Sequence, residues 1–595
     1  MRDRLQVKQL QVERSNLPPA SFQRILQLPR FRLLLVWGLM MAGTAGLLLN
    51  LYRLQVSQAS MLEGKARKQQ MIYMRPFVPR RQIIDRNSNV LAVDQPVYRL
   101  YAHPKLFKRS KPEIAALLAP VIGKTPTALE KLFNQKPSGI RVGRLLTEEV
   151  ADRVARLQVD GLELIQQYSR LYPQQDLAAD VVGYVDVDHR GQAGVEYSQE
   201  KLLERAVRTL RLSRAGNGAI MPDHVPEGFL HFDDLRLQLT LDSRLQRAAR
   251  FALKEKIEQF KAERGTVIVM DALDGSLLAL VSEPTYNPNR YYDFDVGLFK
   301  NWALSDLYEP GSTFKPLNVA IALEAGVIQP DSQFNDPGRI QIGRWPIANY
   351  DFESRGGRGL LTVSQILEYS SNIGMVRIIQ QMKPSVYYGW LERLGLGQKV
   401  GIDLPFESPG QIKSQQEFTT SPIEPATTSF GQGFSLTPIQ LVQLHATLAN
   451  GGKLVTPHVV QGLYDTKAQL YWQPRLSAPH PIFSPATTQT VLAMMEKVVM
   501  EGTGRNAQIP GYRIAGKTGT AQKASPTGGY YTNARITSFV GIFPVDSPRY
   551  VVLAVVDEPK GRDAFGSTVA APIVKSVIEA LIAIERLPPS QPMER

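Results

Sequence analysis

The feature that most constrains this chain is an uncharged segment of twenty residues, Leu33–Tyr52. A helix of that length spans the hydrocarbon core of a bilayer. Arg30 and Arg32 precede the segment and Arg53 follows it, so positive charge is heavier on the N-terminal side. Because basic flanks stay on the cytoplasmic side of a membrane, we predict a transmembrane helix over 33–52, a cytoplasmic tail over 1–32 and export of the residues that follow.

A cleaved signal peptide is the alternative reading of this segment. Gly43–Ala45 loosely resembles the small-residue site at which such peptides are cut, but the apolar run continues through Leu47–Leu49. Cleavage sites follow the apolar region rather than interrupt it. The pattern therefore favours an anchor that stays attached.

The composition excludes several kinds of site. The chain has 595 residues, more than one core accommodates, so two or more domains are expected. It has no cysteine, and its seven histidines are scattered without metal-ligand spacing, so no metal or other cofactor is predicted. One of them, His445, lies in an apolar helical pattern that is typical of a core residue. The net charge of +14 is spread out and accompanies no nucleic-acid motif, which suits solvated surface near an anionic membrane and wall.

The fold class predicted for the exported part is α+β, in two domains. Residues 53–234 read as a mixed α/β pedestal, with a strand at Val90–Tyr101 and a helix at Leu145–Leu157. We find no paired nucleophile and base there. Ser198 and Lys201 share the spacing of a serine–lysine pair, but no apolar helix follows them.

Residues 235–583 read as a second domain. Alternation at Leu235–Leu241 predicts a strand, and a helix capped by Asp242 or Ser243 follows. Two strands joined at Asp274–Gly275 form a hairpin, and a further pair lies near the C-terminal end, at Ile536–Phe543 and Tyr550–Val556. Strands at both ends with helices between them predict one antiparallel sheet flanked by helices, beside a helical subdomain. Residues 584–595 read as a tail.

A serine–lysine pair stands at the start of a predicted helix in this domain. Pro310–Gly311 suits a turn, and the apolar run Leu317–Leu323 suits a buried helix. Ser312 and Lys315 are three residues apart, so they share a helix face near an end that carries partial positive charge. This arrangement is typical of a serine nucleophile with a lysine partner.

Two further stretches follow in order. Ser370 and Asn372 come after a helix-like run, and Lys517–Thr520 reads as a strand whose glycine, Gly519, permits close approach of a ligand. Each stretch alone is a weak signal. The ordered set S-x-x-K, S-x-N and K-T-G is the signature of penicillin-binding proteins and class A β-lactamases.

At this point the chain resembles the class B penicillin-binding proteins, which are peptidoglycan D,D-transpeptidases. The resemblance runs from the membrane span to about residue 575 and is carried by Glu309–Pro316, Ser370–Asn372, Ser429–Gly433, Lys517–Ala521 and, in the pedestal, Arg80, Ile83, Asp85–Asn87, Leu91–Ala92 and Gly194–Glu196. Within this family the chain resembles the division (septal) members, and the asparagine at position 372 supports that resemblance. Arg81 and Ser88 stand where the family usually has glycine, and their effect stays open.

The resemblance implies a role for each motif residue. Ser312 is the expected nucleophile, and Lys315 is the expected base, although the identity of the base is left open. Ser370, between Lys315 and Lys517, is expected to relay the proton to the leaving D-alanine, and burial together with the like charge of Lys517 is expected to lower the pKa of Lys315. Asn372 is expected to bind a substrate amide, and Lys517, Thr518, Gly519 and Thr520 are expected to bind the substrate carboxylate and line the site. The N–H groups of Ser312 and Thr520 are expected to form the oxyanion hole.

The implied reaction is acyl transfer from a D-Ala-D-Ala stem peptide to an amine of a neighbouring stem. Hydrolysis by a carboxypeptidase or β-lactamase shares the three motifs, and a non-catalytic division scaffold is a further alternative. The resemblance also implies a bacterial inner membrane location, with the catalytic domain periplasmic. The partners that it implies are peptidoglycan stem peptides, a membrane glycosyltransferase and other division proteins.

Overall fold

The computed structural model describes residues 27–74, 78–143, 145–205, 210–214, 220–221, 232–525 and 529–590. The chain divides into two units, one made of residues 1–76 with 207–231 and the other of 77–206 with 232–595. Most of the predicted cytoplasmic tail, and the last five residues of the predicted C-terminal tail, lie outside the described residues. Each unit is described by itself.

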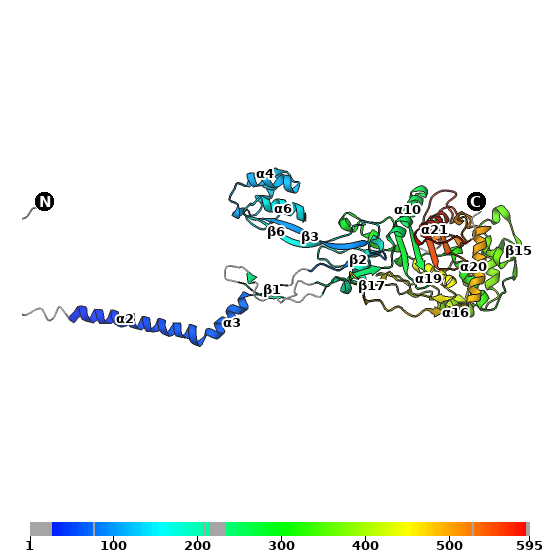
Figure 1. Ribbon diagram of the computed structural model, residues 1–595. Coiled ribbons are helices and arrows are strands. Elements are labelled where there is room, and N and C mark those ends of the chain that lie inside the picture. The colour runs from blue at the N-terminus through cyan, green and yellow to red at the C-terminus, as the bar shows by residue number, and fades with distance from the viewer. Residues whose placement is uncertain are drawn as a thin grey trace, which may run out of the picture. The chain divides into compact units, whose positions relative to one another are not determined.

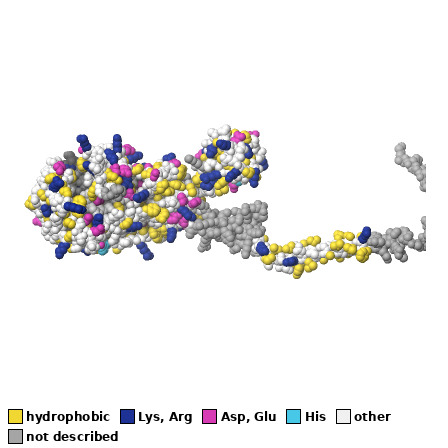
Figure 2. All heavy atoms as spheres, turned by 180° about the vertical axis from the view of Figure 1, so that it is seen from behind, with side chains coloured by type: hydrophobic (Ala, Val, Ile, Leu, Met, Phe, Trp, Pro, Cys, Tyr) yellow, Lys and Arg dark blue, Asp and Glu magenta, His cyan; other side chains and the backbone are white. Residues whose placement is uncertain are grey.

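The first unit contains the predicted membrane span. Its helix α2 covers Gln27–Tyr52, continues as a π-turn over Arg53–Ser57, and is followed by α3, Ala59–Gln70. From Phe31 to Ser57 the helix is long and apolar enough to cross a membrane, and none of its most apolar window is buried. Figure 2 shows hydrophobic side chains along this helix. The predicted span is therefore helical and exposed, which supports a single-pass membrane protein. Three short strands, β1 (Met71–Met74), β7 (Leu210–Arg214) and β8 (Ile220–Met221), complete the unit.

The second unit begins with a pedestal built on a long strand. This strand, β3 (Val90–Ala102), pairs antiparallel with β6 (Leu162–Leu171) along most of its length. Three helices cover a small core around Leu100 and Phe133; they are α4 (Lys111–Ile122), α5 (Pro126–Phe133) and α6 (Glu148–Arg156). Figure 1 shows α4 and α6 beside β3 and β6.

The predicted pedestal elements are confirmed with one change of boundary. The strand expected at Val90–Tyr101 is β3. The helix expected at Leu145–Leu157 is shorter, because Leu146–Thr147 pairs with β3 as β5 and the helix begins only at Glu148. Leu146 and Thr147, which the helical pattern had included, therefore belong to the sheet.

Strands from distant parts of the chain join the pedestal to the second domain. The pedestal strand β2 (Gln82–Ile84) pairs in parallel with β9 (Arg236–Leu239), which pairs in turn with β17 (Val460–Tyr464). The alternating segment Leu235–Leu241 is thus a strand, as expected, but its neighbours lie far away in the sequence. A sheet shared in this way fastens the two domains into one unit.

A five-stranded antiparallel sheet forms the centre of the second domain, as the sequence predicted. Its order is β11 (Leu277–Glu283), β10 (Arg264–Asp271), β22 (Tyr550–Asp557), β21 (Tyr530–Phe543) and β20 (Ala515–Ala524). In β10, Val267 and Val269 face one core, which also contains α10 (Ser243–Phe260) and α21 (Ala570–Glu585). The alternate residues Ile268 and Met270 face the core that contains the helical subdomain. Burial on both faces follows from the two-residue period of a strand.

The strand expected at Ile536–Phe543 begins earlier, at Tyr530. The residues from Tyr530 to Arg535, which precede the predicted strand, also belong to it. Ala524 pairs with Tyr530, so the β20–β21 hairpin extends to that point. Aromatic and β-branched residues favour this extended backbone.

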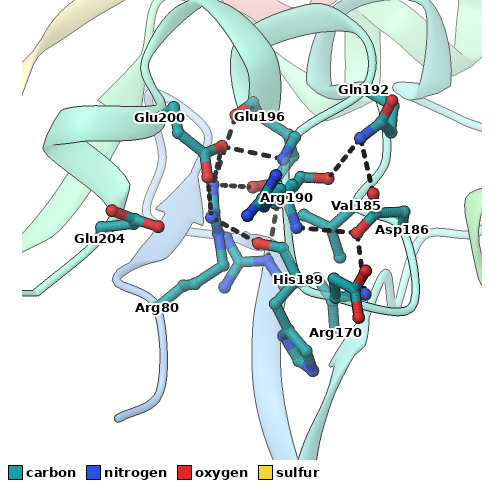
Figure 3. A network of polar contacts seen from close by, with 12 residues as sticks. Arg80, Arg170, Val185, Asp186, His189, Arg190, Gln192, Glu196, Glu200 and Glu204 are labelled. Atoms are coloured by element: carbon teal, nitrogen blue, oxygen red, sulfur yellow. Dashed lines mark hydrogen bonds and ion pairs between the residues drawn. The ribbon is translucent and has the colours of Figure 1, made fainter. Parts of the chain in front are cut away.

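The pedestal contains a buried network of charges around Arg80 (Figure 3). Arg80 forms ion pairs with Glu200 at 2.9 Å and Glu196 at 3.0 Å, and it donates to the carbonyl of His189 at 2.8 Å. The neighbouring Arg170 contacts Glu196 at 2.6 Å and Asp94 at 3.1 Å. Arg80 and Glu196, which are among the residues that carry the family resemblance, thus contact each other in this network.

The two departures from glycine have different consequences. Arg81 forms a two-point contact with Asp233, at 2.9 and 2.8 Å, and donates to the carbonyl of Leu202. The arginine therefore joins two segments that are distant in the sequence. Ser88 adopts a φ of +66° in the turn after Asp85, a conformation in which a side chain is strained and glycine is not.

On the face shown in Figure 2, Lys and Arg side chains are interspersed with Asp and Glu. This distribution agrees with the expectation of a solvated surface rather than a nucleic-acid groove.

Candidate active site

The serine–lysine pair lies where a turn becomes a helix. Gly311–Phe314 forms a 3-10 turn that leads directly into α12, Lys315–Glu324. Ser312 is half-buried, whereas Thr313 and Lys315 are fully buried. The predicted position of Ser312 near a helix start is confirmed.

Neighbouring segments hold this turn from two sides. Gly311 N–H donates to the carbonyl of Gly431 at 2.9 Å, and Gly431 has a φ of +85°. A Cβ on Gly431 would lie 2.0 Å from the Gly311 oxygen, so glycine is required here by the approach of two backbones. Of the two reasons for a glycine here, a turn or contact with a ligand, the structure supports the turn.

His445 supports the same turn from α19, Pro438–Ala449. Its Nε2 lies 2.9 Å from the carbonyl oxygen of Thr313, and the side chain is fully buried, as expected for a core residue. Burial lowers the pKa of His445 to about 4, so the ring is neutral at neutral pH and its Nε2–H donates to that oxygen.

Ser370 lies between two helices in a strained conformation. It follows α14 (Val363–Glu368) and precedes α15 (Asn372–Ile379), and its φ is +57°. The next residue, Ser371, caps α15 by accepting a hydrogen bond from Gly374 N–H at 2.8 Å. This geometry directs the Ser370 hydroxyl and the Asn372 amide towards α12.

Lys315 meets both of these groups. Its Nζ donates to the Ser370 carbonyl at 2.6 Å, to Ser370 Oγ at 3.2 Å and to Asn372 Oδ1 at 2.8 Å. These hydrogen bonds go to Ser370 and Asn372 rather than to Ser312. Catalytic hydrogen bonds are often made only in the substrate complex, so this geometry is compatible with a later Ser312–Lys315 contact.

Lys517 approaches the same hydroxyl from β20. Its Nζ donates to Ser370 Oγ and to the carbonyl of Thr518, each at 3.0 Å. Ser370 Oγ therefore lies between two buried ammonium groups, as the sequence analysis expected. Burial lowers the pKa of Lys517 to about 7. Burial and then repulsion by Lys517 hold the pKa of Lys315 well below its usual value, while the charge of Asp336 opposes this.

The remaining predicted site residues continue along β20. Thr518 Oγ1 forms a hydrogen bond with Thr503 Oγ1 at 2.8 Å, and Thr520 Oγ1 accepts from Gly566 N–H at 3.0 Å. A Cβ on Gly519 would lie 2.4 Å from Ser538 Oγ and 3.0 Å from the methyl group of Thr313. The protein itself takes the space that a side chain would need at this position, which accounts for a glycine here, and the predicted contact of Gly519 with a ligand stays a prediction.

Sequence reasoning missed the residues beneath Ser370–Asn372. Asp336 and Asn349 form a fully or almost fully buried pair below Ser371, and Asp336 Oδ2 accepts from Ser371 Oγ at 2.6 Å. Glu309, at the site's edge, accepts hydrogen bonds from Gly433 N–H at 2.9 Å and from the hydroxyl of Tyr530 at 2.9 Å. Only the turn-like run from Asp336 to Gly338 gave a local signal, and it indicated a loop.

An acidic cluster outside the site offers three carboxylates, from Glu263, Asp557 and Glu558. Lys523 Nζ contacts all three, at 3.2, 3.0 and 2.9 Å. The ammonium group of Lys523 therefore already occupies the point at which these three carboxylates converge.

Comparison with known proteins decides the family. Residues 265–579 match the model of the penicillin binding protein transpeptidase domain, and residues 77–209 match that of the penicillin-binding protein dimerisation domain. The chain belongs to the penicillin-binding protein transpeptidases. The resemblance drawn from the three motifs is therefore confirmed, as is the expectation of a serine-type transpeptidase.

Individual relatives of this penicillin-binding protein agree along nearly the whole chain. The peptidoglycan D,D-transpeptidase FtsI homolog of Mesostigma viride is 43% identical over 579 residues, which cover 94% of this chain and 97% of that one. The peptidoglycan D,D-transpeptidase FtsI of Escherichia coli (strain K12) is 30% identical and covers 94% of this chain and 92% of its own length. The crystal structure of penicillin-binding protein 3 from Mycobacterium tuberculosis, complexed with aztreonam, matches with a TM-score of 0.64 at 26% identity, covering 87% of this chain and 98% of that chain.

Proposed function

We propose that this transpeptidase cross-links stem peptides of septal peptidoglycan through an acyl-enzyme on Ser312. The observation that carries the proposal is the position of Ser370 Oγ, which lies 3.2 Å from Lys315 Nζ and 3.0 Å from Lys517 Nζ. Two buried amines around one hydroxyl, beside a serine at a helix start, provide a route for a proton in and out of the site.

In the first half-reaction Ser312 Oγ attacks the carbonyl carbon of the penultimate D-alanine. A C–O bond forms, the amide C–N bond breaks, and the terminal D-alanine leaves. The hydroxyl proton passes to neutral Lys315, and Ser370 relays a proton from the lysine pair to the departing nitrogen. The lowered pKa values of both lysines keep a neutral amine available near neutral pH.

In the second half-reaction an amine of a neighbouring stem attacks the ester. The amine loses a proton through the same Ser370 route, a C–N bond forms and the ester C–O bond breaks. Ser312 Oγ recovers its proton, so the enzyme returns to its starting state.

Substrate placement follows from the same elements. Asn372 binds a substrate amide, while Lys517, Thr518 and Thr520 bind the terminal carboxylate and Gly519 brings β20 close to the nucleophile turn. The N–H groups of Ser312 and Thr520 bind the oxyanion, and such donors contribute about 2.7–4 kcal/mol each to catalysis.

The location and partners form part of the proposal. We place the anchor in the bacterial inner membrane, with the N-terminus cytoplasmic and the catalytic domain periplasmic. This rests on the charge flanking the span. A membrane glycosyltransferase that polymerises glycan strands and other division proteins are the proposed partners, since cross-linking acts on newly made strands.

Labelling with a fluorescent penicillin tests the nucleophile. We expect the wild-type chain to carry the label on the peptide that contains Ser312, and Ser312→Ala to carry none. A labelled Ser312→Ala, or folded wild-type protein that takes no label, contradicts the proposal.

A second measurement separates the possible reactions of the acyl-enzyme. Transfer to an added D-amino acid or stem-peptide amine supports transpeptidation, whereas rapid hydrolysis that ignores amines supports a carboxypeptidase or β-lactamase. Normal septation in cells that carry only Ser312→Ala supports a scaffold instead.

The absence of cysteine from this sequence makes the orientation easy to test. Single cysteines are introduced at Ser15, in the tail, and at Ser477, on an exposed loop. A maleimide that cannot cross the inner membrane is expected to label Ser477→Cys but not Ser15→Cys in cells with a permeabilised outer membrane. The opposite pattern contradicts the proposed topology.

A further inference from the structure

A buried carboxylate lies beneath the Ser370 turn and belongs to none of the three motifs. Asp336, at the end of β12 (Gln333–Asp336), is fully buried. Its Oδ1 accepts from Gly338 N–H at 2.8 Å, and its Oδ2 accepts from Ser371 Oγ at 2.6 Å. Asn349 Nδ2 donates to both oxygens, at 2.9 and 2.8 Å. Three neutral donor groups thus make four hydrogen bonds to the two oxygens, so each oxygen of this buried carboxylate accepts two.

Asn349 extends this contact to the backbone of α15. Its Oδ1 accepts from Asn372 N–H at 2.8 Å and from Ile373 N–H at 3.3 Å. The Ser371 hydroxyl and the two N–H groups that follow it are thus all tied to the Asp336–Asn349 pair.

Ser370 needs such support, because its φ of +57° is unfavourable for a residue with a side chain. A conformation of this kind costs about 1–3 kcal/mol and persists only where the surrounding structure imposes it. The turn nevertheless decides the chemistry, since it presents Ser370 Oγ to Lys315 and Lys517.

The charge of Asp336 also bears on the lysines. The charged groups that act on Lys315 are Lys517, from β20, and Asp336. Glu368 is the last residue of α14, and its carboxylate accepts a hydrogen bond from Ser364 Oγ at 2.7 Å. Ser370 follows the same helix. From α19 comes neutral His445, which contacts the preceding turn. Asp336 is thus the negative charge that opposes the lowering of the pKa of Lys315 by burial and by Lys517.

We propose that Asp336 is a positioning residue for acyl transfer. Through Asn349 and Ser371 it holds Ser370 in the left-handed turn between the two lysines, and it supplies a buried negative charge to this site. The proposal rests on Ser312 as the acylated residue.

The test follows the acylation rate and the non-covalent affinity of the full chain for a fluorescent penicillin across pH 5–9. Asp336→Ala is expected to lower the acylation rate constant about 100-fold, as for an active-site group misplaced by about 1 Å, with little change in non-covalent affinity. Asp331→Asn, which removes an exposed carboxylate from the same subdomain, serves as the matched control and is expected to behave as wild type.

Two further variants separate geometry from charge. Asp336→Asn keeps the size of the side chain but removes the charge and replaces one accepting oxygen by a donating amide; loss of the charge lowers the pKa of Lys315, so the acid limb of the profile is expected to move to lower pH. The exchange Asp336→Asn with Asn349→Asp restores a carboxylate–amide pair and is expected to recover most of the rate at the pH optimum.

The outcomes are distinct. Wild-type acylation by folded Asp336→Ala overturns the proposal. A rate loss in Asp336→Asn with an unchanged pH profile overturns the role of the charge, and an exchange variant as slow as Asp336→Asn overturns the role of the hydrogen bonds. If Asp336→Ala does not fold, the acylation rates of Asp336→Asn and of the exchange variant decide whether Asp336 is a positioning residue. Wild-type protein that takes no label at Ser312 contradicts the proposed function instead.

Discussion

Two pairs of buried cations in this molecule have opposite electrostatics. In the pedestal, Arg80 and Arg170 are 4% and 1% exposed, and carboxylates of Glu196, Glu200 and Asp94 surround them. Burial tends to lower the pKa of each arginine, but Glu196 and its neighbours outweigh it and raise both pKa values. The pair is locked in its charged form.

In the active site, Lys315 and Lys517 are equally buried, but the groups that they contact are uncharged. Ser370, Asn372 and Thr518 accept their hydrogen bonds, and the pKa values of both lysines fall. Burial tends to lower the pKa in both pairs, so the opposite directions of their pKa shifts come from whether an anion contacts the cation. A fully paired cation fixes structure, whereas a cation left without an anion in contact can gain and lose a proton.

The largest effect is expected from replacing the unpaired cation. Lys315→Met is expected to slow acylation by penicillin at least about 1,000-fold, which corresponds to about 4 kcal/mol of transition-state stabilisation. Its unfolding free energy is expected to stay the same or rise, because a poorly compensated buried charge is removed. Penicillin labelling and urea unfolding of the full chain in detergent measure the two quantities. If the unfolding free energy of Lys315→Met falls along with its acylation rate, the proposed difference between the two pairs of cations is contradicted.

The paired cations are expected to respond in the opposite way. Glu196→Gln leaves Arg80 and Arg170 buried without their shared carboxylate, which is expected to cost about 3–5 kcal/mol of stability. The folded fraction is expected to keep the wild-type acylation rate, since the network belongs to the pedestal. Urea unfolding and labelling per folded molecule check this. Glu163→Gln, at an exposed pedestal carboxylate, is the control.

Local sequence signals predicted much of the site. Ser312, Lys315, Ser370 and Lys517 could be found because each lies in a short motif at a recognisable helix start, turn or strand. The five-stranded sheet followed from strand patterns at both ends of its domain. The lowered pKa of Lys315 was predicted from burial and from the like charge of Lys517, whereas the lowered pKa of Lys517 itself was not.

What the sequence did not reveal depends on contacts between distant segments. Asp336 and Asn349 act on Ser371 from elsewhere in the chain, and neither belongs to a periodic pattern. The parallel pairing of β2 with β9 is set by packing rather than by local propensity. The sequence likewise did not reveal that Ser538 and Thr313, which lie on other elements, fill the space beside Gly519.

The lowered lysine pKa values also predict how stability depends on pH. Lys517 titrates at about 7 when folded and near 10.4 when unfolded, so between these values the unfolded chain binds more protons. Stability therefore rises with pH in this window and is lost as pH falls towards 7. We expect the unfolding free energy of the wild type to gain about 2 kcal/mol more than that of Lys517→Met between pH 7 and 9. Equal slopes in parallel urea titrations contradict the difference between the two pairs of cations.

The smallest effect concerns two serines with the same unusual backbone. Ser88 in the pedestal and Ser370 in the active site have φ values of +66° and +57°. Ser88 is exposed and no motif requires its hydroxyl, so Ser88→Gly is expected to relieve strain and to stabilise the protein by about 0.5 kcal/mol, after the greater flexibility of unfolded glycine is counted. Its acylation rate is expected to equal that of the wild type. Ser370→Gly relieves the same strain but removes the hydroxyl between the lysines, so its acylation is expected to fail. Urea unfolding and penicillin labelling of both variants measure this, and a Ser88→Gly variant less stable than the wild type shows that the pedestal needs this serine.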